Sequence, residues 1–365
     1  MQRILILLVW VATLGACVDR SVSVILPQAL EVGTAQTVFA ATTRAREPDG
    51  SFGYRRAEDL RFLELTVSIP PSHRPGTLDF SYSDPDPAKQ FVLAGLKEFD
   101  GPQDLKMRLN GVQEVTIFVH GFNSTQTETA FRAAQLAYDI GLPGQTLIYS
   151  WPSRGSGIGY AYDLDSMLFA RDGLERTVRE LKSIGVPRVL IVAHSMGGAL
   201  TMEMLRQAEL REPGWARRNL DGVLLISPDL DVDVFRSQMA SIKTPPDPFL
   251  LMVSRKDRVL GISARLRGTA KSERLGNIQS TEKLADYPIS IIDATAFNND
   301  ADSSHFVAAT SPALVSLLGS ARRVSRTFGK DRGGVDLLVP PAVRNENGAT
   351  EVVLMESGQV RVSSP

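Results

Sequence analysis

Short apolar runs rich in β-branched residues recur through the middle of the chain, and this pattern most restricts the fold. The runs lie at residues 115–119, 146–149, 189–193, 223–226, 249–253 and 289–292. Short continuous runs of this kind are typical of strands that are buried on both faces of a sheet. Helical patterns separate or follow them, at residues 128–140, 164–184, 198–210 and 311–324. Strands that alternate with helices predict an α/β fold with a mainly parallel, twisted sheet and helices on both faces.

The segments on either side of this region show weaker patterns. Residues 37–43 and 60–69 each predict a strand, and residues 77–83 are a candidate antiparallel neighbour of the second. The tail from about residue 330 contains Gly-Gly, Pro-Pro and Asn-Glu-Asn-Gly, which predicts a loosely packed extension with one short strand near 352–355. The expected division is a leader at 1–16, a tether with a first strand at 17–59, a main domain at 60–325 and an extension at 326–365.

Composition excludes several classes of protein. Hydrophobic residues make up 43% of the 365 residues and charged residues 22%, which is typical of a globular chain. The 40 Lys and Arg residues balance 41 Asp and Glu residues, so no overall basic surplus favours nucleic acid. With a single cysteine, Cys17, the chain cannot form an intramolecular disulfide or a multi-cysteine metal site.

One segment carries a pattern associated with catalysis. Residues 189–198 read V-L-I-V-A-H-S-M-G-G, so an apolar strand pattern ends at Ser195 and a helical pattern follows. The segment resembles the nucleophile elbow of the α/β-hydrolase superfamily, in which a serine occupies a strained strand-to-helix turn. Small flanking residues are required because strand and helix come very close there. Here Ala193 stands in place of the first glycine of G-x-S-x-G.

The resemblance implies a catalytic triad in the chain order serine, acid, histidine. Of the four histidines only His305 follows Ser195, and it lies in the polar segment 298–306 after the last predicted strand. The expected acid is Asp257, just after the run at 249–253, where it would orient the histidine and stabilise its cationic form. Three carboxylates that follow the preceding strand remain alternatives for the acid: Asp229, Asp231 and Asp233.

The same resemblance implies an oxyanion hole built from two backbone N–H groups. One belongs to Met196, directly after the nucleophile at the start of a helix. The other belongs to Phe122, where the run at 115–119 gives way to His120 and Gly121. His120 is then expected to be structural rather than a base. A triad of this kind requires neither a metal ion nor an organic cofactor, so none is expected.

The first residues predict targeting. The apolar run at 4–14 is too short for a membrane-spanning helix, which needs about 20 residues, and it reads as part of a signal peptide. The ending L-G-A-C at 14–17 resembles the bacterial lipobox, which implies cleavage after residue 16 and a diacylglycerol on Cys17. Val18 in the next position favours the outer membrane. We therefore expect a periplasmic protein of the cell envelope, attached to a membrane surface through its lipid.

Two further segments are similar to a bacterial lipoprotein-like subfamily of α/β-hydrolases whose function is unassigned. They are T-V-F-A-A-T-T-R at 37–44 and S-W-P-S-R-G at 150–155, the second leading to Tyr160 and Asp163. Nearby aromatic side chains either line a substrate pocket or pack the loops; they are Trp151, Tyr160 and Phe122.

The superfamily resemblance implies a serine hydrolase that cleaves a carboxylic ester or thioester through an acyl-enzyme, with a small-molecule ester or a lipid as substrate. Two alternatives stay open. The first is a non-catalytic binding or scaffold lipoprotein of the envelope, and the second is an acyltransferase with the same triad. The presence of all three triad residue types in the right order favours an enzyme over a scaffold.

Overall fold

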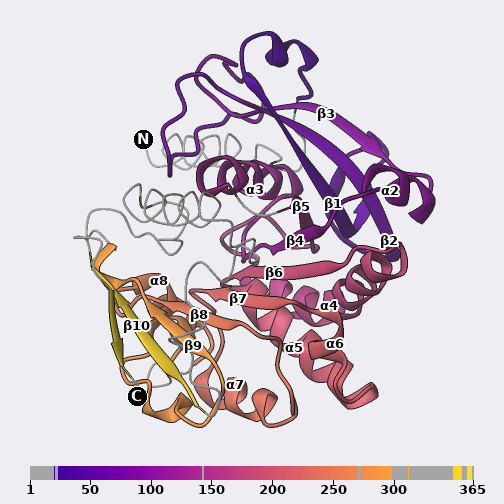
Figure 1. Cartoon of the computed structure of the whole chain (residues 1–365). Coiled ribbons are helices and arrows are strands. Elements are labelled where there is room, and N and C mark those ends of the chain that lie inside the picture. Colours follow the sequence, from indigo (N-terminus) through magenta and orange to yellow (C-terminus); the bar gives the residue numbers. More distant parts are fainter. Residues whose placement is uncertain are drawn as a thin grey trace, which may run out of the picture.

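A twisted sheet forms the centre of the molecule (Figure 1). The structure, a computed structural model, describes residue 20 and residues 24–141, 144–268, 273–297, 311, 348–355 and 360–363. Within these residues the sheet has eleven strands in the order β11-β10-β9-β8-β7-β6-β4-β5-β1-β2-β3. This arrangement, with helices on both faces, confirms the α/β fold predicted from the sequence.

Eight neighbouring strands among the described residues run parallel to one another. They are β1 (Thr34–Arg46), β5 (Gln145–Ser150), β4 (Glu114–Val119), β6 (Arg188–His194), β7 (Gly222–Ile226), β8 (Phe249–Val253), β9 (Ser290–Asp293) and β10 (Thr350–Leu354). The six apolar runs of the sequence form β4 to β9. Every residue of β4, β7, β8 and β9 is buried, as expected of strands covered on both faces.

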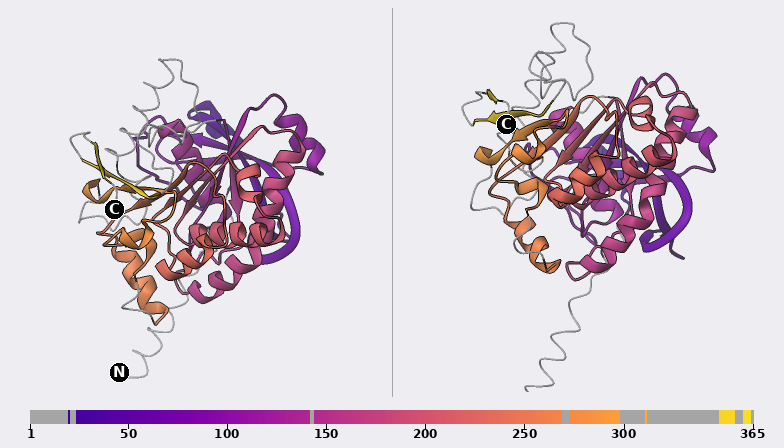
Figure 2. Two further views of the ribbon diagram at one scale, coloured as in Figure 1. Left: turned by 60° about the horizontal axis from the view of Figure 1, so that its bottom comes forward. Right: turned by 90° about the horizontal axis from the view of Figure 1, so that it is seen from below.

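Two apolar cores lie on the two faces of the sheet (Figures 1 and 2). Helix α3 (Gln126–Ile140) contributes to one core, and the other core contains residues of α4 (Tyr160–Ser183), α5 (Met196–Arg211), α6 (Trp215–Asn219) and α7 (Val232–Met239). Strand β4 serves both, since Ile117 belongs to one core and Phe118 to the other. The remaining helical elements are η1 (Pro27–Glu31), α2 (Pro102–Arg108), α8 (Arg258–Leu266), η2 (Leu275–Asn277), η3 (Glu282–Leu284) and η4 (Thr295–Phe297).

The antiparallel edge of the sheet differs from the sequence prediction. Strand β2 (Phe52–Ile69) pairs antiparallel with β1 and with β3 (Val92–Glu98). The prediction of a strand at 77–83 was wrong: its one ladder contact is an isolated bridge between Phe80 and Phe91. No residue of 77–83 is buried, whereas Val92 and Leu93 of β3 are. The segment that can bury a side chain therefore takes the place beside β2.

The predicted boundary at the start of the main domain meets continuous structure, whereas the one at 325/326 lies outside the described residues. The boundary at 59/60 falls inside β2, and β1 lies in the same sheet as β4 to β9. In the tail the predicted short strand is β10, and β11 (Val360–Ser363) pairs with it antiparallel. Val352 and Leu354 of β10 are buried in the core. The helix predicted at 311–324 lies outside the described residues, apart from residue 311. Among the helices of the described segments, none combines the length and apolarity required to cross a bilayer.

Helix α5 lies so close to β4 that Gly197 has no room for a side chain. A Cβ there would lie 2.4 Å from the carbonyl oxygen of His120 and 2.5 Å from that of Val119. We expect Gly197→Ala to lower the free energy of unfolding by about 1–3 kcal/mol, because the helix must shift. Urea denaturation followed by circular dichroism measures this.

The matched control for that substitution is Gly261→Ala in α8, where a Cβ would meet nothing within 4 Å. Alanine is the better helix former, so this variant should be unchanged or more stable by up to about 1 kcal/mol. Equal stabilities for the two variants would contradict the close approach at Gly197.

Candidate active site

Ser195 lies on the turn between β6 and α5 in a strained backbone conformation. Its φ is 53° and its ψ is −121°, values that a residue with a Cβ adopts only when its surroundings impose them. Backbone hydrogen bonds impose this conformation. The Ser195 N–H donates to the carbonyl of Ile226 (3.0 Å), and the Ser195 carbonyl accepts from the N–H groups of Gly198 (2.9 Å) and Asp229 (3.1 Å). The neighbouring strand β7 therefore holds the turn in place.

Strained residues gather at this edge of the sheet. Within the described residues, three non-glycine residues have positive φ: Ser195, Asn123 at 58° and Ser227 at 42°. They follow the carboxyl ends of the neighbouring strands β6, β4 and β7. Backbone strain concentrates at functional sites because the rest of the fold must stabilise it. The strain thus marks the edge at which the sequence predicts catalysis.

The loop after β4 touches the serine turn. A Cβ on Gly121 would lie 3.0 Å from Cβ of Ser195 and 3.0 Å from Nδ1 of His194. Phe122 directly follows Gly121 in the chain. The amide of Phe122 is therefore one peptide bond beyond the residue that contacts Ser195. In the described part of the chain, neither the Phe122 N–H nor the Met196 N–H donates to a partner. Met196 is the first residue of α5, where N–H groups have no partner within the helix. Two unsatisfied donors beside a serine are what an oxyanion hole requires.

The carboxylates that the sequence offers as triad acid occupy different environments. Asp257 follows β8, is buried, and caps α8 through Oδ1, which accepts from the amides of Val259 (3.1 Å) and Leu260 (3.3 Å). Asp231 caps α7 in the same way. The Asp233 side chain is 83% exposed and lies 3.7 Å from Arg236.

Asp229 is held by an arginine cluster. Its Oδ1 accepts from Nε (2.8 Å) and Nη2 (2.6 Å) of Arg274 and from Ser263 (2.5 Å), and its Oδ2 accepts from Tyr160 (2.8 Å). Burial opposes the charge, but the guanidinium groups of Arg274 and Arg267 outweigh it and lower the pKa of Asp229. With both oxygens committed to this cluster, Asp229 is poorly placed to orient a histidine.

Two predicted residues, His305 and Cys17, lie outside the described residues, so their roles stay predictions. Ser195, Asp257 and Met196 lie at the carboxyl ends of β6 and β8, and Phe122 lies after β4. In the described segments no cluster of three or more His, Cys, Asp and Glu side chains could hold a metal ion.

His120 supports the loop rather than acting as a base. Its ring stacks on Trp151 with centroids 4.8 Å apart, and the Trp151 indole N–H donates to the His120 carbonyl (2.8 Å). Burial, reinforced by the nearby Arg44 charge, lowers the pKa of His120 to about 3, so the ring is neutral. Its nitrogens lie 2.8 Å from the Gly121 carbonyl and 3.1 Å from the Trp151 carbonyl, and a neutral ring donates to one of them.

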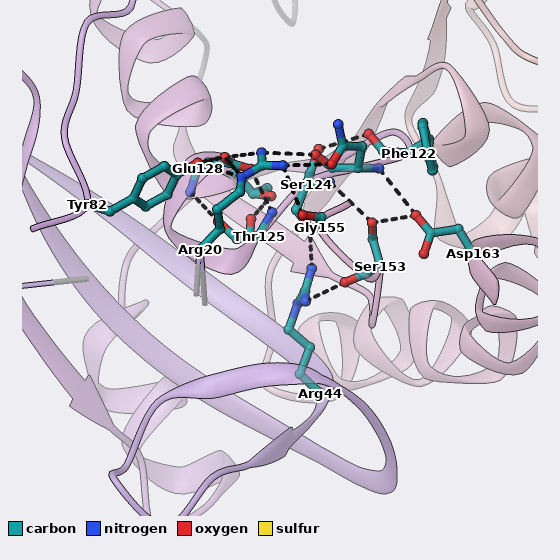
Figure 3. Close-up of polar contacts among 12 residues, drawn as sticks. Arg20, Arg44, Tyr82, Phe122, Ser124, Thr125, Glu128, Ser153, Gly155 and Asp163 are labelled. Atoms are coloured by element: carbon teal, nitrogen blue, oxygen red, sulfur yellow. Dashed lines mark hydrogen bonds and ion pairs between the residues drawn. The ribbon is translucent and has the colours of Figure 1, made fainter. Parts of the chain in front are cut away.

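Two residues whose role the sequence did not reveal, Arg44 and Asp163, fix the same loop (Figure 3). The buried Arg44 guanidinium donates to the carbonyls of Ser124 (2.8 Å), Ser153 (3.0 Å) and Gly53 (2.9 Å). Burial lowers the pKa of Arg44 to about 10, which leaves it cationic near neutrality.

Asp163 accepts from the amides of Asn123 (3.2 Å) and Arg154 (2.6 Å) and from the Ser153 hydroxyl (2.6 Å). The segments 37–44 and 150–155 and Asp163, noted in the sequence without a role, are therefore the supports of the candidate oxyanion loop. The aromatic residues of these segments pack the loop: Trp151 is fully buried and Tyr160 contacts Phe122 edge-on, with ring centroids 5.3 Å apart.

A strained serine between a buried parallel strand and a helix, with free amides beside it, defines the class of α/β-hydrolases. The sequence model of the family described as "Alpha/beta hydrolase of unknown function (DUF900)" matches residues 98–322, and the chain belongs to that family. No protein of curated function matches the sequence.

Several solved structures of esterases and of one hydrolase are similar to this chain at low sequence identity. An esterase from Rhizomucor miehei is 12% identical with a TM-score of 0.33, covering 83% of this chain and 86% of its own. Brefeldin A esterase, a bacterial homologue of human hormone-sensitive lipase, is 13% identical with a TM-score of 0.37, covering 84% and 82%. Dienelactone hydrolase from Anabaena variabilis is 15% identical with a TM-score of 0.36, covering 73% and 91%.

The buried state of His120 predicts a pH dependence of stability. Below its ordinary pKa of 6.5 the unfolded chain binds a proton at this residue, whereas the folded chain does so only near pH 3. The free energy of unfolding therefore decreases as pH falls through this window, by up to ~1.4 kcal/mol per pH unit from His120.

The test compares urea denaturation of the wild type and His120→Gln between about pH 7 and 4.5. The variant lacks this titration. The difference between the free energies of unfolding of wild type and variant should therefore become smaller by about 2–3 kcal/mol as the pH falls from about 7 to 4.5. A deficit that stays constant or widens would show that the folded ring is charged.

Proposed function

We propose that this protein is a serine hydrolase that cleaves a carboxylic ester or thioester through an acyl-enzyme. The observation that carries the proposal is the strained conformation of Ser195 beside the free amides of Met196 and Phe122. No simple structural need explains a positive φ at a serine, since a glycine there would remove the strain. A serine held on such a turn is suited to attack an acyl group.

The reaction we infer uses the chain's own residues in sequence. The Ser195 hydroxyl attacks the acyl carbon while His305 takes its proton, and Asp257 stabilises the resulting imidazolium. The amides of Met196 and Phe122 hold the negative oxygen of the tetrahedral intermediate, aided by the positive end of α5. His305 then protonates the leaving alcohol or thiol. Water, deprotonated by His305, hydrolyses the acyl-enzyme and frees Ser195.

The nucleophile assignment can be tested with a fluorophosphonate probe and a series of p-nitrophenyl esters of increasing chain length. We expect Ser195→Ala to lose labelling completely and to lose at least about 10³-fold in kcat. His305→Ala should lose a similar factor in kcat, because the hydroxyl then lacks its base.

The control for this experiment is Ser227→Ala, which removes a buried serine that also has a positive φ and follows the next strand. It should retain labelling by the probe. Labelling that survives Ser195→Ala but not Ser227→Ala would place the nucleophile one strand away.

Among the acids, Asp257→Asn should lower kcat far more than Asp231→Asn does. Both carboxylates cap helices, but only Asp257 is assigned to the triad.

We further propose that the protein is a lipoprotein of the cell envelope, anchored to a membrane through Cys17. In cells fed an alkyne analogue of palmitate, the wild type should incorporate the label and fractionate with membranes. Cys17→Ser should carry no label, because the thiol that accepts the diacylglycerol is absent. Label that persists in the variant would contradict the anchor.

A further inference from the structure

The Arg20 side chain docks on the loop that carries Phe122, far from it in sequence (Figure 3). Its Nη1 donates to Oδ1 of Asn123 (2.8 Å) and to the carbonyl of Gly155 (2.9 Å), and its Nη2 reaches the Asn123 carbonyl (3.5 Å). It thereby joins two loops at the catalytic edge, the one after β4 and the one after β5. The side chain remains 32% exposed.

Glu128 and Tyr82 hold the arginine in place. Oε1 of Glu128 forms an ion pair with Arg20 and also accepts from the Tyr82 hydroxyl, while Oε2 accepts from the Thr125 amide (2.9 Å). Burial disfavours the charge of Arg20, but hydrogen bonds to Glu128 and Tyr82 outweigh it and raise its pKa. The contact extends to the start of α3, because Glu128 and Thr125 form the capping box of that helix.

Arg20 and Asp163 hold Asn123 from opposite ends. Asp163 accepts from its N–H, whereas Arg20 binds its side-chain oxygen and its carbonyl. Asn123 has a φ of 58°, a positive value that residues other than glycine seldom adopt. The residue before it is Phe122. The direction in which the Phe122 N–H points therefore depends on the contacts that keep Asn123 in this conformation.

We propose that Arg20 is a positioning residue for the oxyanion hole, so that the N-terminal tether is a working part of the active site. The inference rests on the proposed hydrolase function for its kinetic consequence, but the docking itself can be measured without catalysis. Arg20 touches neither the nucleophile nor the free amides. It acts through Asn123 and Gly155.

The test uses the full-length protein with Arg20→Ala, Arg20→Lys and, as a control, Arg74→Ala, which removes an exposed arginine from the loop at 70–76. On p-nitrophenyl butyrate we expect Arg20→Ala to lower kcat about 10- to 100-fold with KM within about twofold of wild type. A lysine cannot reproduce the forked contacts, so Arg20→Lys should recover only part of this loss. Arg74→Ala should match the wild type.

Chemical rescue separates positioning from a general loss of structure. Added guanidinium at millimolar concentration should restore part of the activity of Arg20→Ala and none of that of Ser195→Ala. A kcat for Arg20→Ala within about twofold of the wild type would overturn the inference and leave the hydrolase assignment intact.

Hydrogen exchange gives a readout that does not depend on catalysis. In Arg20→Ala, amide exchange should accelerate in peptides that cover residues 121–128 and stay unchanged in peptides from β8 and β9. Unchanged exchange at 121–128 would overturn the inference even if no ester is hydrolysed. A wild type that is inert to esters and to the fluorophosphonate, together with accelerated exchange in the variant, would reject the function and retain the docking.

Discussion

The turn at Ser195 leaves no space for a side chain at Gly197 or Gly121, and this constraint shapes the edge of the sheet that carries the candidate site. Gly197 brings α5 against the carbonyls of Val119 and His120, and Gly121 brings the next loop against Ser195 itself. Because β4 and β6 are adjacent and parallel, their carboxyl ends deliver both segments to one place. The backbone after two strands, rather than a set of side chains, therefore forms the candidate oxyanion hole.

The irregular loop after β4 is unfavourable in free energy, because its carbonyls and amides have no partners in regular secondary structure. Charged side chains supply the partners here. Arg44 binds three carbonyls from three segments, and Asp163 binds two amides and a hydroxyl. Burying a charge is unfavourable, and the hydrogen bonds to these two groups offset part of the lost hydration. Burial still lowers the pKa of Arg44 and raises the pKa of Asp163. The result is a loop of fixed shape in a part of the molecule that has to be irregular.

The sequence predicts the central sheet well because its strands carry a local signal. Six continuous apolar runs become β4 to β9, and the small residues around Ser195 identify the sharp turn. The edge was harder, since residues 77–83 and 92–98 both contain apolar residues and only burial against β2 and η1 decides between them. The residues that support the candidate oxyanion loop could be noticed in the sequence, but their role could not be predicted from it. Arg44 and Ser124 are 80 residues apart, and no local pattern encodes a contact over that distance.

The N-terminal segment around Arg20 links the candidate site to the proposed lipid anchor. Arg20 follows Cys17 by three positions, and an extended chain of that length spans at most about 11 Å. A lipid on Cys17 would therefore hold the membrane surface close to the loop that carries Phe122, whereas a long flexible linker would not. An ester that resides in or near that surface would then meet the catalytic edge directly. With the proposed lipid on Cys17, one short segment would both attach the protein to a membrane and support the candidate site.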